Sequence, residues 1–304
     1  MSRTRLLLIH VGRHKTGTTA VQKQLQTLQR PLRRRGVLVP STGLSQQQHL
    51  LIPASCLPEH PALPPGPPPT LESLIQHLDQ EWERSNAPCC LLSSEVFCEL
   101  AFRQPTESQA LLQKLHAITD QLRLLQVVRP LRDTILSAIK HQLRNDHLLQ
   151  RSPLSWAEHC RRKQTALDHH WIHSGHPLLT LPYSSHRIID DLLQAVLREI
   201  GREATWPRLR RHLKQAQETR ANADELPEAI YAAQLIQIVQ QQQAGQAPIG
   251  LAGLWEQIGQ RLPSLPNGCF EALVNLPQQA TAQDDWALIQ TSEAWALLRP
   301  LLSD

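Results

Sequence analysis

Residues 9–20 read Ile-His-Val-Gly-Arg-His-Lys-Thr-Gly-Thr-Thr-Ala, and this stretch decides the fold of the chain. An apolar run at residues 6–9 leads into a short loop with two glycines, and the loop opens into a segment with helical periodicity. The layout predicts a β-strand, a tight turn and the N-terminus of a helix. Backbone N–H groups and the helix dipole at such a turn bind a phosphate or sulfate anion.

The position of the lysine in this loop separates two kinds of anion site. In a Walker A loop, two glycines stand five residues apart and a lysine directly follows the second one. Gly12 and Gly17 keep this step, but Thr18 occupies the lysine position and Lys15 lies inside the loop. The group that reaches the β- and γ-phosphates of a nucleoside triphosphate is therefore missing. Lys15 is placed instead to lie beside the bridging oxygen of a shorter phosphoanhydride. A strand-turn-helix without a ligand is the structural alternative.

The segment His10–Thr19 resembles the 5′-phosphosulfate loop of bacterial-type sulfotransferases, which use 3′-phosphoadenosine 5′-phosphosulfate (PAPS). Their loop usually reads Pro-Lys-Ser/Thr-Gly-Thr-Thr, and His14 replaces the proline here. The resemblance implies a P-loop-like fold, PAPS as co-substrate and no metal requirement. It also implies that the loop residues that bind the co-substrate are Gly12, Arg13, Lys15, Thr16, Gly17, Thr18 and Thr19.

A second anion site is predicted where a later strand ends. Residues 127–137 resemble the family's 3′-phosphate motif, in which an arginine ends a strand and a serine follows eight positions later on a helix. Arg129 and Ser137 have this spacing. A guanidinium can pair a phosphate bidentately, and a hydroxyl adds another donor. Tyr183 follows the next strand, where the family often places a tyrosine against the adenine. An ordinary salt bridge for Arg129 and core packing for Tyr183 are the alternatives.

The resemblance also implies an in-line displacement at sulfur, in which the acceptor must lose a proton to a general base. Lys15 would stabilise the leaving oxygen, and positioning and electrostatics would supply most of the catalysis. Glu95, just past the strand at residues 89–94, is the candidate base. His14 and His49 are the other candidates. Glu95 could instead simply begin a helix and complement its dipole.

Strands alternate with helices over the first two hundred residues, which predicts an α/β three-layer sandwich with a mostly parallel central sheet. The expected strands are residues 6–9, 36–40, 89–94, 124–128 and 178–181. The expected helices include residues 70–84, with Thr70 as N-cap, and residues 106–122, 153–174 and 186–200. A further helix is expected to begin at Pro130. A first helix is expected to carry Val21, Leu25, Leu28 and Leu32. The candidate binding and catalytic residues follow the ends of strands, and parallel sheets bind ligands at this carboxyl edge. We expect residues 1–202 to form this core, with a Pro-rich insertion at 53–69, and 203–304 to form a helical portion packed on it.

The composition of the chain bears on its partners, its cellular compartment and metal binding. The 304 residues are 41% apolar, and 31 Lys and Arg against 27 Asp and Glu give a net charge of +4, which does not favour nucleic acid as a partner. The six cysteines have no zinc-ligand spacing and indicate a reducing cytoplasm. No run approaches the ~20 apolar residues of a membrane span. The histidines at 169–176 are expected to lie on a solvated face rather than to bind a metal.

The sequence therefore predicts a PAPS-dependent sulfotransferase acting on a hydroxyl or amine of a small molecule or glycan, with carbohydrates among the candidate acceptors. A P-loop small-molecule kinase is one alternative, but it would need a lysine beside Gly17 and a magnesium-binding aspartate after a strand. A non-catalytic nucleotide-binding module is another. Lys15 together with Glu95 favours an enzyme. The oligomeric state is left open.

Overall fold

The computed structural model describes residues 4–13, 16–57, 59–61, 63, 69–148, 153–184, 187–217, 226–275 and 289–302. The chain divides into two compact units: unit 1 is Met1–Arg129 with Thr165–Arg220, and unit 2 is Pro130–Gln164 with Ala221–Asp304. This division differs from the expected boundary at residue 202. Residues 130–164 group with the C-terminal helices, and residues 203–220 group with the sheet.

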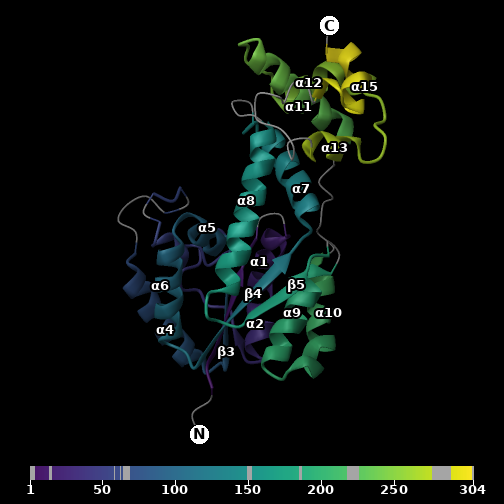
Figure 1. The fold of residues 1–304 in the computed structure, drawn as a ribbon. Helices are drawn as coiled ribbons and strands as arrows, with labels where there is room; N and C mark the ends of the chain where they lie inside the picture. The colour runs from purple at the N-terminus through teal and green to yellow at the C-terminus, as the bar shows by residue number, and fades with distance from the viewer. Residues whose placement is uncertain are drawn as a thin grey trace. The chain divides into compact units, whose positions relative to one another are not determined.

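The described residues of unit 1 contain a five-stranded sheet in which every pairing is parallel. The strands are β1 (Leu6–Val11), β2 (Val37–Leu38), β3 (Cys89–Ser94), β4 (Gln121–Val128) and β5 (Leu178–Pro182), and their order is β2-β3-β1-β4-β5. Figure 1 labels β3, β4 and β5 of this sheet. The predicted α/β class with a parallel central sheet is confirmed. Since β1 is the middle strand, the loop that follows it opens at the centre of the carboxyl edge, where such sheets bind ligands.

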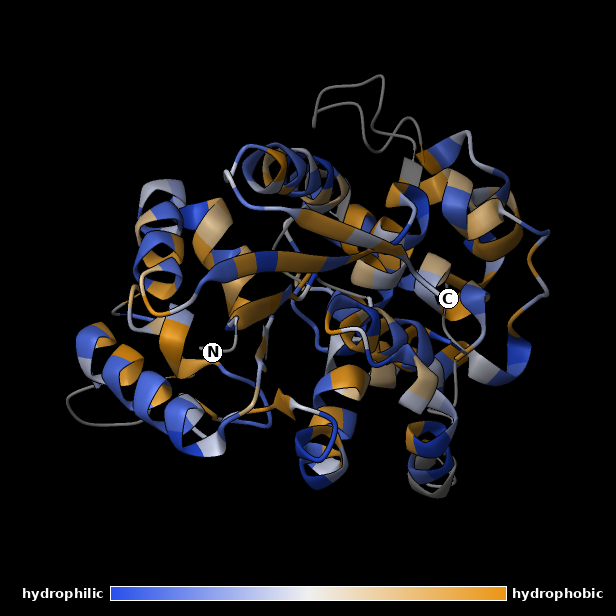
Figure 2. Cartoon of the chain, turned by 90° about the horizontal axis from the view of Figure 1, so that it is seen from below, coloured by the Kyte–Doolittle hydropathy of each residue, from blue (hydrophilic) through white to orange (hydrophobic). Residues whose placement is uncertain are grey.

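Alternate residues of β1 belong to two different hydrophobic cores. Leu7, Ile9 and Val11 lie in one cluster, and Leu6 and Leu8 lie in the other. Because successive side chains of a strand point to opposite faces, helices must cover both faces. One face packs against α3 (Leu51–Ala54), α4 (Leu71–Ser85), α5 (Val96–Arg103), α6 (Pro105–His116) and the later part of α8 (Pro153–Ile172). The other packs against α1 (Thr18–Thr27), α2 (Gln29–Arg33), α9 (Ile188–Glu199) and α10 (Trp206–Gln217), which follows the 3₁₀ turn η1 (Glu203–Thr205). Figure 2 shows helices banded in both colours, as expected for helices with one buried face.

Cys89 and Cys90 on β3 show the same alternation. Cys89 packs in one core and Cys90 in the other, and neither is exposed to solvent. Burial raises the pKa of both thiols, so they act as small apolar side chains. All six cysteines are free thiols.

Two element predictions differ from the structure. The helix expected to carry Val21 to Leu32 is divided at Leu28 into α1 and α2. Leu122, expected on a helix, lies on β4 and pairs with Leu7 of β1. The backbone N–H groups of residues 120 and 121 both donate to the Arg5 carbonyl, which starts this pairing. Helix α5 agrees with the alternative in which Glu95 begins a helix, since Glu95 is its N-cap. The predicted cap is confirmed, since the Thr70 hydroxyl accepts a hydrogen bond from the Ser73 N–H.

Unit 2 is helical in its described part and surrounds one buried helix. Its elements are α7 (Leu131–Arg144), the first part of α8, α11 (Glu228–Gln243), α12 (Leu251–Ile258), the 3₁₀ turn η2 (Gly259–Arg261), α13 (Cys269–Asn275) and α15 (Glu293–Leu302). Every residue of α11 from Ala229 to Val239 is buried. Among the helices of the described ranges, none combines the length and the apolar composition that crossing a membrane requires.

Candidate functional site at the carboxyl edge of the sheet

The loop after β1 packs directly against the end of β3. Val11 is paired with Ser94, and the Gly12 N–H donates to the Ser94 carbonyl at 3.1 Å. A Cβ on Gly12 would lie 2.5 Å from Cγ2 of Thr18 and 3.1 Å from Cγ of Glu95. Glycine is therefore required here, because it lets the loop, the start of α1 and the candidate base pack at van der Waals distance.

Helix α1 begins with an open N-terminus. Its N-cap is Gly17, which has a left-handed φ of 75°, makes no side-chain cap and is followed by no acidic residue in the first turn. The Thr16 and Thr18 hydroxyls donate to the Arg13 carbonyl at 2.7 and 3.1 Å, so they close the loop internally. Thr19 is exposed in the first turn. The backbone N–H groups and the dipole of this turn are the features suited to an anion.

Arg13 forms part of the framework of the loop. Its side chain is 6% exposed, its Nε and Nη2 donate to Oε1 of Gln126 on β4, and Nη2 also donates to Asp168 on α8 at 2.6 Å. Gln126 in turn donates to the Thr180 hydroxyl on β5 at 2.9 Å. This chain of bonds ties the loop to two strands and a helix. Direct binding of the co-substrate by Arg13 stays a prediction.

Arg129 and Tyr183 come together after β4 and β5. The Arg129 guanidinium carbon lies 4.9 Å from the centroid of the Tyr183 ring, and the Tyr183 N–H donates to the Val128 carbonyl at 2.8 Å. A Cβ built on Gly17 would lie 3.5 Å from Cε2 of the same ring. The tyrosine therefore connects the arginine to the N-terminus of α1. A cation over an aromatic face is held in place electrostatically.

The structure does not test three of the predicted residues, Ser137, His14 and Lys15. Ser137 is half-buried on α7 and belongs to unit 2, whereas Arg129 belongs to unit 1. Their pairing on one phosphate stays a prediction. His14 and Lys15 lie outside the described residues.

Glu95 stands at the N-cap position of α5 and is half-buried. Oε1 of Gln48 accepts from the Glu95 backbone N–H at 3.3 Å and from the Ser94 hydroxyl at 2.9 Å. Gln48 follows Gln46 and Gln47, whose φ angles of 48° and 66° are left-handed. We did not predict a role for Gln48, and the sequence carries no signal for it, since glutamine has no preference for such turns.

Two buried histidines are hydrogen-bonded to Ser93, the second-to-last residue of β3. Nδ1 of His49 accepts from the Ser93 N–H at 3.0 Å, and its Nε2 donates to the Pro40 carbonyl at 2.9 Å. Both nitrogens are thus occupied, and burial lowers the His49 pKa to about 4. Both ring nitrogens are used within the fold, which does not favour His49 as a general base, and that role stays a prediction.

His10 is the second of these histidines. Its Nδ1 is hydrogen-bonded to the Ser93 hydroxyl at 2.9 Å, and its buried Nε2 has no partner among the described residues. Burial lowers its pKa to about 4, and the charge of Glu95 acts in the opposite direction. A histidine near the end of an otherwise apolar strand is the sequence signal that could have drawn attention to it.

Metal-ligating side chains do not gather in groups of three or more anywhere in the described ranges. The rings of His169, on α8, and His173, just past the end of that helix, are 4.3 Å apart between centroids.

Comparison of the chain with protein-family models, with characterised proteins and with solved structures found no match. The function is therefore inferred from the geometry of the carboxyl edge.

Proposed function

We propose that the chain is a PAPS-dependent sulfotransferase that moves a sulfuryl group to a hydroxyl or amine acceptor, with carbohydrates among the candidates. The observation that carries the proposal is the meeting of Glu95, Tyr183 and the N-terminus of α1 around the loop after β1. Arg129 joins them through the Tyr183 ring. A parallel sheet binds ligands at this edge, and an uncapped helix start favours an anion. The central position of β1 also supports a P-loop-like fold.

Each residue has a proposed part in the transfer. The N–H groups at the start of α1 hold the 5′-phosphosulfate, and Lys15 neutralises charge on the leaving phosphate oxygen. Arg129, with Ser137, binds the 3′-phosphate, and Tyr183 lies against the adenine. Glu95 accepts the proton that the acceptor loses as its oxygen or nitrogen bonds to sulfur and the bond from sulfur to the leaving oxygen breaks. PAPS supplies the sulfuryl group and leaves as adenosine 3′,5′-bisphosphate.

Calorimetry with adenosine 3′,5′-bisphosphate tests this proposal without knowledge of the acceptor. We expect binding by the full chain, weakened at least tenfold by Lys15→Ala and by Arg129→Ala. Lys23→Ala, an exposed position on α1, and Arg84→Ala, an exposed position on α4, are matched controls that should bind like the wild type.

Absence of binding would contradict the proposal, and so would affinity that is indifferent to both site substitutions. ATP bound more tightly than the bisphosphate would favour the kinase instead.

A further inference from the structure

Helix α11 of unit 2 carries a line of glutamines along one side. Gln234, Gln237 and Gln241 are spaced i, i+3 and i+7, so they share a helix face. Gln234 is fully buried and Gln237 is 7% exposed. The side-chain carbonyl oxygens of all three have no hydrogen-bond partner among the described residues. Three buried acceptors on one face are thus without a donor in the part of the chain that the structure describes.

Two of these glutamines open onto a pocket of about 290 Å³. Its described lining comes from α11, α12, α15 and the connection between α11 and α12, all of which belong to unit 2. The polar part is Gln237, Gln240, Gln241, Gln246 and Gln257, and the apolar part is Ala244, Leu254, Ile258, Leu301 and Leu302. None of these lining residues carries a charge.

The composition of the lining argues for a ligand rather than for core packing. A buried carbonyl without a donor is costly, and native structures pair such groups with protein, water or ligand. Gln234 pairs its amide nitrogen with the Ile249 carbonyl at 2.6 Å, but its oxygen stays without a described donor. If these positions served only to fill space, leucine would do so without that cost. What points to hydrogen-bonding groups supplied from outside is the lining itself, in which five carboxamides stand at the wall of an open pocket.

We propose that this pocket binds one ring of a neutral saccharide. A carboxamide offers both a donor and an acceptor, which matches the neighbouring hydroxyls of a sugar. Leu254, Ile258 and Leu301 offer an apolar wall for the C–H face of the ring. The uncharged lining disfavours phosphate, sulfate and carboxylate ligands, which need compensating charge when buried. The volume lies at the lower end of the ~300–1,000 Å³ of small-molecule sites, so it suits one ring. This inference is independent of sulfuryl transfer.

Saturation-transfer NMR on the full chain tests it, with glucose, galactose, mannose and maltose as ligands and glucuronate as a charged comparator. We expect at least one neutral sugar to bind and to shift the methyl resonances of Leu254 and Leu301, with glucuronate at least tenfold weaker. Maltose bound more tightly than glucose would identify the end of a longer glycan as the ligand, and equal affinity would identify a free monosaccharide.

Gln237→Leu and Gln241→Leu should each weaken sugar binding at least tenfold. Gln243→Leu is the matched control, because it lies exposed at the end of the same helix and should change nothing. The sugar-free Gln237→Leu protein should melt no lower than the wild type, since the substitution removes an unpaired buried carbonyl.

Three results would overturn the proposal: no neutral sugar binding to the wild type, glucuronate binding as well as the neutral sugars, or binding that survives both leucine substitutions. The methyl shifts keep the test decisive if a variant fails to fold.

Discussion

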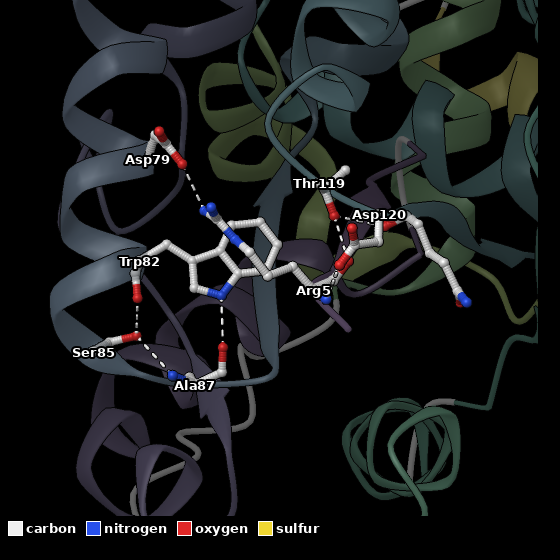
Figure 3. A network of polar contacts seen from close by, with 8 residues as sticks. Arg5, Asp79, Trp82, Ser85, Ala87, Thr119 and Asp120 are labelled. Carbon is white, nitrogen blue, oxygen red and sulfur yellow. Dashed lines mark hydrogen bonds and ion pairs between the residues drawn. The ribbon is translucent and has the colours of Figure 1, made fainter. Parts of the chain in front are cut away.

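The amino and carboxyl edges of the sheet in unit 1 differ in how their polar groups are used. At the amino edge, Arg5 donates through its backbone N–H to Asp120 and accepts at its carbonyl from the Thr119 hydroxyl, both at 2.6 Å (Figure 3). At the carboxyl edge, the N-terminus of α1 has no side-chain cap, and Nε2 of His10 has no partner in the described ranges. Side chains and backbone of the protein bond to one another at both edges, and what distinguishes the carboxyl edge is the helix N-terminus without a side-chain cap.

Trp82 is the centre of the amino edge. Its buried ring lies under the Arg5 guanidinium, 4.3 Å from centroid to carbon, and its indole N–H donates to the Ala87 carbonyl at 2.8 Å (Figure 3). The Arg5 guanidinium also donates to Asp79 at 2.6 Å. These contacts join α4, β1 and the entry to β3. The comparison suggests separate tests for the two ends of the strands: stability for the amino edge, and ligand affinity for the proposed site at the carboxyl edge.

Replacing the candidate base, Glu95, should lower the rate of sulfuryl transfer, and this is the largest effect that we expect. Glu95→Gln keeps the size of the side chain but cannot accept a proton, so the transfer rate should fall by about 10²–10⁴. Affinity for adenosine 3′,5′-bisphosphate should stay within about twofold. The measurement is release of the bisphosphate from PAPS with a panel of sugars and simple alcohols as acceptors. Glu99→Gln, on the same helix, is the control, and an unchanged rate in Glu95→Gln would remove Glu95 from the mechanism.

Removing the Trp82 ring at the amino edge should lower the stability of the protein and leave bisphosphate binding unchanged. Trp82→Ala removes a ring that is 1% exposed, and large-to-small changes of this kind cost about 3–5 kcal/mol. Urea unfolding should show this loss, while the folded fraction binds the bisphosphate as the wild type does. Trp82→Phe keeps a ring but leaves the Ala87 carbonyl without its donor, so its loss should be smaller. A large drop in bisphosphate affinity in either variant would show that the two edges are coupled.

Acid should destabilise the carboxyl edge through His10 and His49. Their folded pKa values of about 4 lie below the ordinary 6.5, so the unfolded chain binds more protons between these values. This contribution to stability is therefore complete above pH 6.5 and is lost as the pH falls toward 4. The expected loss is about 2 kcal/mol for each histidine from pH 7 to pH 5. In urea titrations, the stability gap between wild type and His49→Gln should shrink by that amount, and a constant gap would contradict the assignment.

The strands could be predicted from the sequence because their apolar runs end in turn residues, and Thr70 because a hydroxyl before a periodic segment is a standard cap signal. Helix α5 could be predicted only at its start, by the alternative in which Glu95 begins a helix, and Glu95 is its N-cap. Its eight residues are too few for a helical period to stand out in the sequence. Leu122 was misplaced because its strand pairing depends on Arg5, more than a hundred residues earlier.

The site was predictable only in part, for a similar reason. Gly12, Gly17 and Glu95 could be found from their positions after strands, and the structure brings them together. The occupied side chain of Arg13 could not be found, because its partners Gln126 and Asp168 lie on distant segments. The local sequence pattern shows which residues follow the strands, whereas the hydrogen-bond partner of each side chain is set by tertiary structure.

Gly12→Ala tests the carboxyl edge by placing a methyl group where the loop packs closely against α1. The added methyl would meet Thr18 at 2.5 Å, and forced overpacking costs about 1–3 kcal/mol. If the loop shifts to relieve the clash, bisphosphate affinity should fall about tenfold. Gly253→Ala is the control, because a Cβ there meets nothing within 4 Å. Wild-type affinity in Gly12→Ala, measured by calorimetry, would mean that the loop does not contact the ligand.

The smallest effect is expected from the ion pair of the amino edge. Asp79→Asn leaves the ring stacking and the backbone bonds of Arg5 intact and removes only one charge. Since the two side chains are 32% and 41% exposed, the pair should contribute about 0.5 kcal/mol, and less in high salt. Urea unfolding at low and high ionic strength measures this. A loss near that of Trp82→Ala would mean that charge, rather than the buried indole, holds this edge together.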